Sequence, residues 1–340
     1  MSTIVTMYNN KGGVSKTTTI YNLAVFLAEQ NKVLLVDCDP QCNATELFLA
    51  SEPTFRDPET NLPGTSIYEA LLPRFGGDTG AIDPATVTLV PSTLYNNLFL
   101  VRGDLKFSMA ENYLGTAWNQ AITENINEKK TYVVLHHLLR ALGERHGFKY
   151  ILCDVGPSTG AITRTVVLAS DGFLLPLTPD RFCNQAVKVL GSVVTQWIKR
   201  HKEITKTLPP FNIAPFPGEP VLYGAIIQNF KVYSGRAKQS YTKWQELISK
   251  NIQTDLLAPG GLTLGKKCNP KNPFLASIRE VGPLAPIAQM FGRAIFDVQQ
   301  EHTKQASTTG NMYYGAVWDD WVKRMKEYKD EIAKIAGALP

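Results

Sequence analysis

The chain has 340 residues, of which 44% are hydrophobic and 19% are charged, a composition that excludes an intrinsically disordered protein and suffices for one large core. Its apolar runs, such as residues 33–36 and 173–177, are far shorter than the roughly 20 residues of a membrane-spanning helix. Since the N-terminus has no basic segment followed by an apolar stretch, we expect no export and a cytoplasmic location.

Short apolar segments alternate with amphipathic ones along the chain. The segments that we predict as buried strands are residues 4–7, 33–36, 150–153, 173–177 and 221–227. The segments with apolar residues at helical spacing include residues 17–29, 132–145 and 184–200. A strand, helix, strand repetition predicts an α/β fold with a doubly wound, mostly parallel sheet flanked by helices.

Two stretches interrupt this alternation. Residues 51–91 are rich in Pro, Gly, Asp and Thr, and residues 205–220 contain five prolines. Because the strand pattern resumes after each stretch, we predict two long surface loops within a single domain that spans residues 1–340. Apolar residues at helical spacing predict a final helix near residues 312–337.

The most informative segment is a glycine-containing turn that follows the first predicted strand and opens the first helix. Backbone N–H groups of such a turn close on a phosphate, and the helix N-terminus adds a partial positive charge. Lys16 then neutralises the β and γ oxygens, and the Thr17 hydroxyl is available to Mg²⁺. We therefore predict an ATP and Mg²⁺ site. Its predicted phosphate contacts are Gly12, Gly13, Val14, Ser15, Lys16, Thr17 and Thr18.

This turn departs from the ordinary P-loop pattern GxxxxGK[ST], because Asn10 and Ser15 stand at its two glycine positions. It resembles the deviant Walker A form xKGGxxK[ST] of the ParA/MinD family, and of the ParA-like members in particular. The resemblance implies a nucleotide-sandwich dimer in which Lys11 of each subunit binds the partner's phosphates, a catalytic role like that of an arginine finger. Family loops usually have glycine where Ser15 stands. If φ is positive there, serine is strained by about 1 kcal/mol, and we expect slow hydrolysis.

A second motif ends an apolar strand in two acids. Asp37 and Asp39 lie 21 and 23 residues after Lys16, and the carboxyl end of a parallel strand lies beside the phosphate loop. The segment resembles the family's Walker A′ motif, which implies that Asp39 positions the attacking water and that Asp37 supports the Mg²⁺ shell. Cys42 replaces a glycine that is frequent in the family.

A third motif ends the strand at residues 150–153 in Asp154, and it resembles the Walker B motif whose acid holds Mg²⁺ through water. Where the family commonly has Asp-x-Pro-Pro, this chain has Gly156 before Pro157, a turn that suits a switch segment sensing the γ-phosphate. Asn229, at the end of a later predicted strand, is our candidate for an adenine contact.

The positive charge is unevenly distributed. The segment 188–279 contains 14 Lys and Arg against four acids, a net charge of +10, so the rest of the chain carries −5. Sequence-independent DNA binding needs only cations on one face, and we predict it here, with a merely solvated basic surface as the alternative. The candidate DNA contacts are Lys199, Arg200, Lys202, Lys231, Arg236, Lys238, Lys266 and Lys267.

Two alternatives belong to other classes. A MinD-like protein binds a membrane through a basic C-terminal helix, but residues 318–340 contain five basic and five acidic side chains, which fits a helix packed on its own domain better. An iron–sulfur scaffold needs cysteines that meet at the dimer axis. The five cysteines (Cys38, Cys42, Cys153, Cys183 and Cys268) include no CxxC pair, so we predict reduced, mostly buried thiols.

The ParA-like resemblance therefore implies a Mg²⁺-dependent ATPase that positions cargo. It implies an ATP-bound homodimer on nonspecific nucleoid DNA, and a cargo adaptor protein that stimulates hydrolysis to ADP and phosphate. The cargo is a plasmid, a chromosome or a protein organelle such as a carboxysome, and we expect no membrane association.

Overall fold

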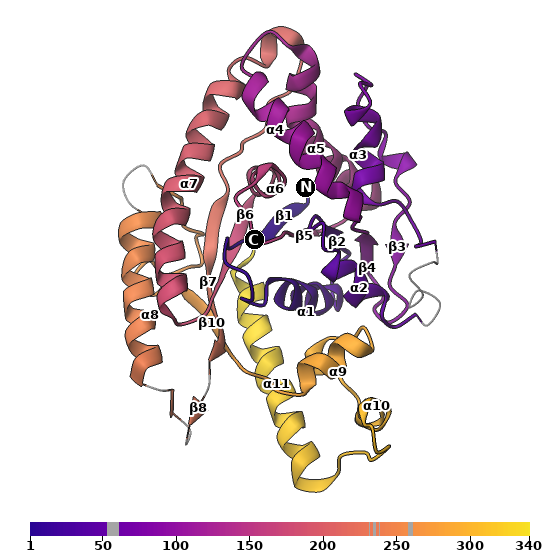
Figure 1. Cartoon of the computed structure of the whole chain (residues 1–340), viewed down its shortest axis with the longest axis vertical. Coiled ribbons are helices and arrows are strands. Elements are labelled where there is room, and N and C mark those ends of the chain that lie inside the picture. Colours follow the sequence, from indigo (N-terminus) through magenta and orange to yellow (C-terminus); the bar gives the residue numbers. More distant parts are fainter. Residues whose placement is uncertain (53–60, 231, 234–235, 238, 258–260) are drawn as a thin grey trace.

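The computed structural model describes the chain except residues 53–60, 231, 234–235, 238 and 258–260. An eight-stranded sheet with the order β10-β7-β6-β1-β5-β2-β4-β3 forms its centre (Figure 1). The strands are β1 (Thr3–Met7), β2 (Val33–Asp37), β3 (Val90–Pro91), β4 (Leu98–Val101), β5 (Tyr150–Asp154), β6 (Gly172–Leu177), β7 (Val221–Phe230) and β10 (Phe274–Arg279). Neighbouring strands are parallel except β3, which pairs antiparallel with β4. The predicted doubly wound, mostly parallel sheet is confirmed.

The register of the central strands places their acidic ends together. Met7 and Asp37 each lie opposite Asp154 in the two ladders that β5 makes with β1 and β2. All five residues of β2 and of β5 are buried, as expected for strands covered on both faces. The carboxyl ends of three adjacent strands therefore meet at the edge where the phosphate loop begins.

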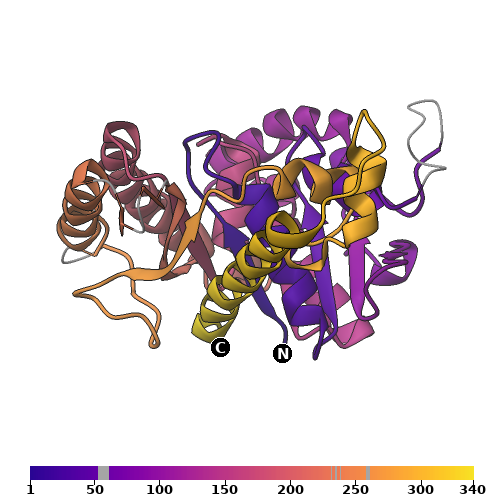
Figure 2. The same ribbon diagram turned by 90° about the horizontal axis from the view of Figure 1, so that it is seen from below.

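Helices cover both faces of the sheet. One hydrophobic core joins it to α3 to α8, and the other joins it to α1, α2, α9 and α11. In Figure 2, α7 and α8 pack together at the β7 and β10 end of the sheet, away from α9 and α10. The helices are α1 (Lys16–Ala28), α2 (Asn43–Leu49), α3 (Ile67–Phe75), α4 (Ala110–Gln120), α5 (Ile126–His146), α6 (Ala161–Ala169), α7 (Arg181–Thr205), α8 (Gln239–Asn251), α9 (Leu284–Met290), α10 (Gln300–Ala306) and α11 (Gly315–Ala338).

The prediction of a surface loop over residues 51–91 was wrong for residues 67–75 and 90–91, which form α3 and β3. A capping box begins α3: the Ser66 hydroxyl accepts the N–H of Glu69 at 3.0 Å, and the Glu69 carboxylate accepts the N–H of Ser66 at 2.7 Å. The helix then buries Leu71 and Phe75. Residues 206–220 agree better with a loop, since their one regular element is the short turn η4 (Pro209–Phe211).

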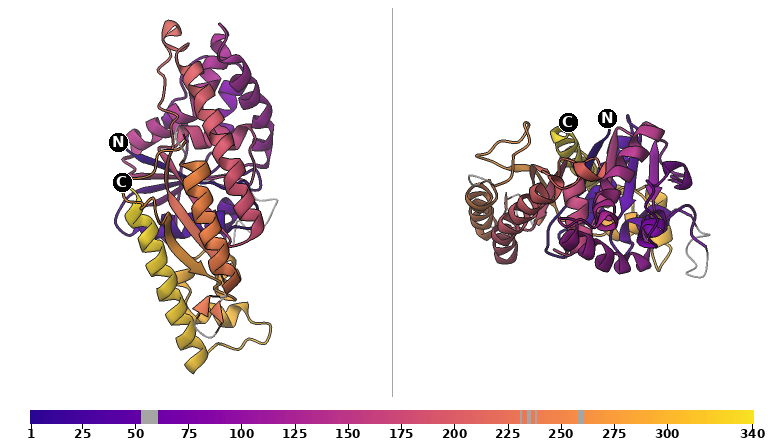
Figure 3. Two further views of the ribbon diagram at one scale, coloured as in Figure 1. Left: turned by 90° about the vertical axis from the view of Figure 1, so that its left-hand side faces the viewer. Right: turned by 90° about the horizontal axis from the view of Figure 1, so that it is seen from above.

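The predicted C-terminal helix is α11, and its apolar stripe packs inside the molecule. Trp321, Met325, Tyr328, Ile332 and Ile335 are buried, in contact with α1 and β10. The chain then ends beside the N-terminal strand (Figure 3), where the Tyr150 hydroxyl donates to the Pro340 carbonyl at 3.1 Å. These residues pack on the chain's own domain, whereas Val322 on the same helix is 45% exposed. Among the described residues, the helices are all too short or too polar to cross a membrane.

Candidate nucleotide-binding site

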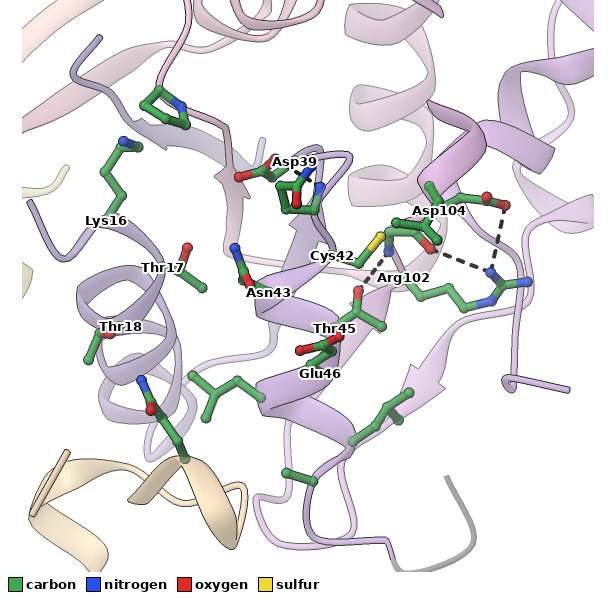
Figure 4. A pocket seen from close by; sticks show the side chains of 18 of the residues that line it. Lys16, Thr17, Thr18, Asp39, Cys42, Asn43, Thr45, Glu46, Arg102 and Asp104 are labelled. Carbon is green, nitrogen blue, oxygen red and sulfur yellow. Dashed lines mark hydrogen bonds and ion pairs between the residues drawn. The ribbon is translucent and has the colours of Figure 1, made fainter. Parts of the chain in front are cut away.

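A cavity of about 1270 Å³ opens at the phosphate loop. The predicted phosphate contacts, residues 12–18, line one end together with Asp39 and Pro157, and Arg102 and Asp104 line the other (Figure 4). The loop bends at Gly13, whose φ of 71° favours glycine, and then enters α1. The N-terminus of α1 therefore faces the cavity, as an anion site requires.

Lys16 and Thr17 begin α1 at the bottom of this cavity. Lys16 is only 7% exposed, and its ammonium donates to the Lys11 carbonyl at 3.1 Å. Burial lowers the pKa of Lys16, and the nearby carboxylates of Asp154 and Asp39 oppose this shift. The hydrogen bond to Lys11 thus holds the Lys16 ammonium beside the acids and at the phosphate end of the cavity.

The three predicted acids converge beside this lysine. Asp37 Oδ2 accepts both the N–H and the hydroxyl of Thr45, at 2.8 and 2.7 Å, and Asp37 Oδ1 accepts the N–H of Asp39 at 3.2 Å. Burial raises the pKa of Asp37 to about 6 against these hydrogen bonds. Asp39 lines the cavity itself, whereas Asp37 is fully buried and does not line it.

Asp154 has the features of a cation ligand. Its Oδ2 accepts the Thr17 hydroxyl at 2.7 Å, but its buried Oδ1 has no hydrogen-bond partner in the described part of the chain. Burial, and then the proximity of Asp37, raise the pKa of Asp154 to about 8. A buried carboxylate oxygen without a donor is costly unless a cation compensates it. The residues present therefore fit Mg²⁺, whose preferred ligands are carboxylate, hydroxyl and water oxygens.

The pH dependence of Mg²⁺ binding follows from this raised pKa. Below about pH 8 the ion-free protein holds a proton at Asp154, and Mg²⁺ must displace it, so we expect affinity in the presence of ADP to rise from about pH 6.5 to about pH 8.5 and then level off. Calorimetric titration in two buffers of different ionisation enthalpy measures the released proton. Titration of free ADP under the same conditions is the control. Equal affinities at the two pH values would contradict this expectation.

Two residues that replace family glycines adopt the backbone conformation that glycine favours. Ser15 has φ of 58°, and Cys42 has φ of 56°, both in the left-handed region. An L-residue with a Cβ is strained there by about 1–2 kcal/mol. The strain expected for Ser15 from the sequence is therefore present, and it lies in both loops that border the phosphate end of the cavity.

We expect Ser15→Gly to raise the free energy of unfolding by about 1 kcal/mol, because relief of strain exceeds the entropy that glycine adds to the unfolded chain. Urea denaturation measures the change. Ser249→Gly is the matched control, since Ser249 lies in α8 and glycine there should cost up to about 1 kcal/mol. Destabilisation of both variants would show that the Ser15 conformation carries no strain.

Lys11 lies outside its own cavity. Its ammonium donates to Asp180 Oδ2 at 2.6 Å and to the Thr178 hydroxyl at 3.0 Å, and it lies 5.6 Å from the centre of the Phe182 ring. Burial raises the pKa of Asp180, but hydrogen bonds from Lys11 and Thr178 outweigh it and hold the pKa below its usual range. Phe182 is 70% exposed at the start of α7. In the single chain the Lys11 ammonium therefore lies beside Asp180 and the exposed Phe182 ring and does not line the cavity.

Sequence reasoning missed three residues of this site. Asp180 anchors Lys11, Thr45 holds Asp37, and Glu111 binds the start of α6. The only local signal was the pattern of a helix cap, since Asp180 precedes α7 and its carboxylate accepts the Cys183 N–H at 2.8 Å. The predicted adenine contact, Asn229, is the last residue but one of β7. Its side chain is not among those that the structure describes.

The predicted DNA contacts do not form one cluster. Lys199, Arg200 and Lys202 lie at the end of α7 beside the start of β7, where Lys202 pairs with Glu219 at 2.9 Å and Arg200 with Glu203 at 3.2 Å. Lys266 and Lys267 also lie near the start of β7, because Gly265 bonds to Leu222, and Lys267 donates to the Leu339 carbonyl at 2.6 Å. Arg236 belongs to β9 (Arg236–Ala237), which pairs with β8 (Val232–Tyr233) beyond the other end of β7. Lys231 and Lys238 lie outside the described residues.

The five cysteines form no disulfide, and four of them (Cys38, Cys153, Cys183 and Cys268) are buried. Buried thiols cannot meet across a subunit interface, and only Cys42 is partly exposed. The iron–sulfur alternative requires a pair of cysteines at the surface, and the described residues include no such pair.

A deviant glycine loop, a buried lysine and three acids at the carboxyl ends of parallel strands define a nucleotide site of the P-loop NTPase class. A family model described as an AAA domain, AAA_31, matches residues 2–207, more than half of the chain, so the protein belongs to this family. The resemblance to ParA-like members of the ParA/MinD superfamily is thereby confirmed.

Relatives and solved structures agree with this assignment. The chain is 28% identical to the sporulation initiation inhibitor protein Soj of Bacillus subtilis over 59% of this chain and 68% of that protein. It is 31% identical to the chromosome partitioning protein ParA of Myxococcus xanthus over 56% of this chain and 57% of that protein. The match thus covers less than two thirds of that relative's length. The structure of an ATP complex of a Cyanothece McdA variant shares the fold, with a TM-score of 0.60 and 18% identity over 98% of this chain and 96% of that one.

Proposed function

We propose that this protein is an ATP-dependent partition or positioning ATPase that hydrolyses ATP to ADP and phosphate. The observation that carries the proposal is the proximity of Lys16 and Asp39, which line one end of the cavity, to the buried Asp154, which accepts the Thr17 hydroxyl. Phosphoryl transfer to water needs positioned charges and an oriented water more than covalent chemistry. The described side chains supply both.

The residues have separate roles in the proposed reaction. Lys16 and the N–H groups of residues 12–18 bind and orient the β and γ phosphates, and Asp39 holds the attacking water in line. Asp154 and Thr17 hold Mg²⁺, with Asp37 behind them. When bound, Mg²⁺ neutralises the charge that develops on the phosphate oxygens.

Dimer formation is part of the proposal, because the Lys11 ammonium does not line its own cavity and a second copy that faces it brings this cation to the phosphates. In one chain, Lys11 is tied to Asp180 beside the exposed Phe182. When two copies face each other across ATP, Lys11 of each leaves Asp180 for the partner's phosphates. Dimerisation thus requires bound ATP.

The proposed partners are nonspecific DNA, bound by the ATP dimer, and an adaptor protein on the cargo that stimulates hydrolysis. The net charge of +10 in segment 188–279 supports an anionic partner, and the name of one relative, the chromosome partitioning protein ParA, points to chromosome partitioning. McdA, a protein of the same fold, leaves an organelle cargo as the second candidate. A protein of this kind works in the cytoplasm on the nucleoid.

A DNA-binding assay tests this function. With ATP and Mg²⁺, affinity for duplex DNA of arbitrary sequence should fall linearly with salt on logarithmic axes, as counterion release requires. Lys16→Ala is the matched control, since it removes the phosphate-binding cation and should behave like the nucleotide-free protein. Equal DNA affinity with and without ATP contradicts the proposal.

A further inference from the structure

The turn between β5 and α6, residues 155–160, contacts two parts of the candidate site. Pro157 lies against the phosphate loop, where a Cβ added at Gly12 would be 3.7 Å from the proline ring. Gly156 lies against Asp39, whose Oδ1 would be 3.1 Å from a Cβ at that glycine. The position of this turn therefore decides how Asp39 and the loop face the γ-phosphate.

Helix α6 begins directly after this turn, but its own N-cap residue, Gly160, has no side chain to bind the free N–H groups of the first turn. A distant carboxylate binds them instead. Glu111, on α4, accepts the N–H of Ala161 at 2.6 Å and the N–H of Ile162 at 3.3 Å. A Cβ at Gly160 would lie 2.6 Å from a Glu111 carboxylate oxygen, so the glycine leaves the space that the carboxylate fills.

The segment that carries Glu111 is anchored at its other end to the second acidic motif. The hydroxyl of Thr45, which is labelled in Figure 4, accepts the N–H of Gly103 at 2.7 Å. The same hydroxyl donates to Asp37. The short helix η3 (Leu105–Met109) then leads from Gly103 into α4. One continuous segment, residues 103–111, thus binds both Thr45, which holds Asp37, and the start of α6, which follows the turn 155–160.

We propose that Glu111 is a positioning residue for ATP hydrolysis, because it fixes the start of α6 and with it the turn that lies on Asp39. The inference rests on the proposed ATPase function. Glu111 does not line the cavity, so it acts through the turn 155–160 and not on the nucleotide. Its loss therefore changes the rate of the chemical step and leaves nucleotide affinity intact.

The first test separates kcat from KM. Glu111→Ala should lower kcat about fivefold to tenfold, the effect of losing a helix cap, with an unchanged KM and ADP affinity. Glu111→Gln keeps an acceptor oxygen and should retain most of kcat. Glu124→Ala, at an exposed acid after α4, is the control and should match the wild type. A rise in KM with unchanged kcat overturns the proposal.

The second test uses the close contact between Gly160 and Glu111. Gly160→Ala should lower kcat in the wild-type background, because the new methyl displaces the carboxylate. In the Glu111→Ala background the same substitution meets no carboxylate and should cause little further loss. Full additivity of the two losses overturns the proposal.

Hydrogen exchange separates this inference from the proposed function, because it needs no turnover. With ADP bound, amides 161 and 162 should exchange at least several times faster in Glu111→Ala than in the wild type. Unchanged exchange overturns the proposal, and so does faster exchange with wild-type kcat. A wild-type protein that binds ATP but never hydrolyses it contradicts the proposed function instead. In that case, hydrogen exchange of residues 155–162 is compared between the ATP complexes of the wild type and Glu111→Ala. The comparison decides whether Glu111 positions the turn.

Discussion

Asp39→Ala should reduce ATP hydrolysis by at least about 100-fold while ATP stays bound, because the variant loses the carboxylate that orients the attacking water and keeps every phosphate contact. The carboxylate is 7% exposed, and it is held by the N–H of Gln41 at 3.0 Å, so its orientation is fixed before the nucleotide arrives. Single-turnover measurements with radiolabelled ATP give the rate, and filter binding gives the affinity.

Two variants control this result. Asp39→Asn keeps the shape of the side chain but not the charge, so it should be nearly as slow as Asp39→Ala. Asp83→Ala removes an exposed carboxylate that caps η2 (Pro84–Thr86), outside the cavity, and should leave the rate unchanged. A rate close to that of the wild type in Asp39→Ala would assign the water to another group, and loss of ATP binding would make Asp39 a ligand of the nucleotide.

The sequence was sufficient for the strands β1, β2, β5, β6 and β7 and for the acids at their carboxyl ends, whereas β3, β4 and β10 were not predicted. Asp37, Asp39 and Asp154 each follow an apolar strand, and parallel strands bring their carboxyl ends to one edge, so their proximity to Lys16 needed no knowledge of the helices. The strain at Ser15 was equally local, because it depends only on the φ that the loop imposes.

Contacts between distant segments were not predictable in this way. Asp180 lies 169 residues from Lys11, and Glu111 lies 50 residues from Ala161, so only the packing of α7 and α4 onto the sheet brings each pair together. In contrast, α3 was overlooked although Ser66 and Glu69 have the spacing of a capping box, because the surrounding Pro and Gly content favoured a loop.

The separation of the basic residues was not predictable for the same reason, because it depends on how distant segments pack. Clusters along the chain do not reveal which end of a strand they adjoin, and β7, with ten residues, is about 33 Å long. Lys199 and Lys266 therefore adjoin its start, while Arg236 follows its end. A DNA-binding surface that uses both groups must extend along the whole β7 side of the molecule or arise from two subunits.

Lys11→Ala should abolish the ATP-dependent dimer while each chain still binds ATP, because the Lys11 ammonium does not line its own cavity and its proposed ligand is the partner's triphosphate. Asp39→Ala is used as the background so that ATP persists, and analytical ultracentrifugation measures the dimer. Lys32→Ala, at a lysine near the opposite edge of the sheet, is the control and should dimerise normally.

The ion pair that holds Lys11 in the single chain leads to the opposite expectation for its partner. Asp180→Asn keeps the oxygen that caps α7 but loses the charge that attracts Lys11, so the lysine is released more easily. Asp180 is more than one third exposed, and such a pair contributes about 1 kcal/mol or less. The variant should therefore dimerise with ATP at a protein concentration up to about fivefold lower than the wild type does. Weaker dimerisation would mean that Asp180 serves the dimer directly and does not compete with it for Lys11.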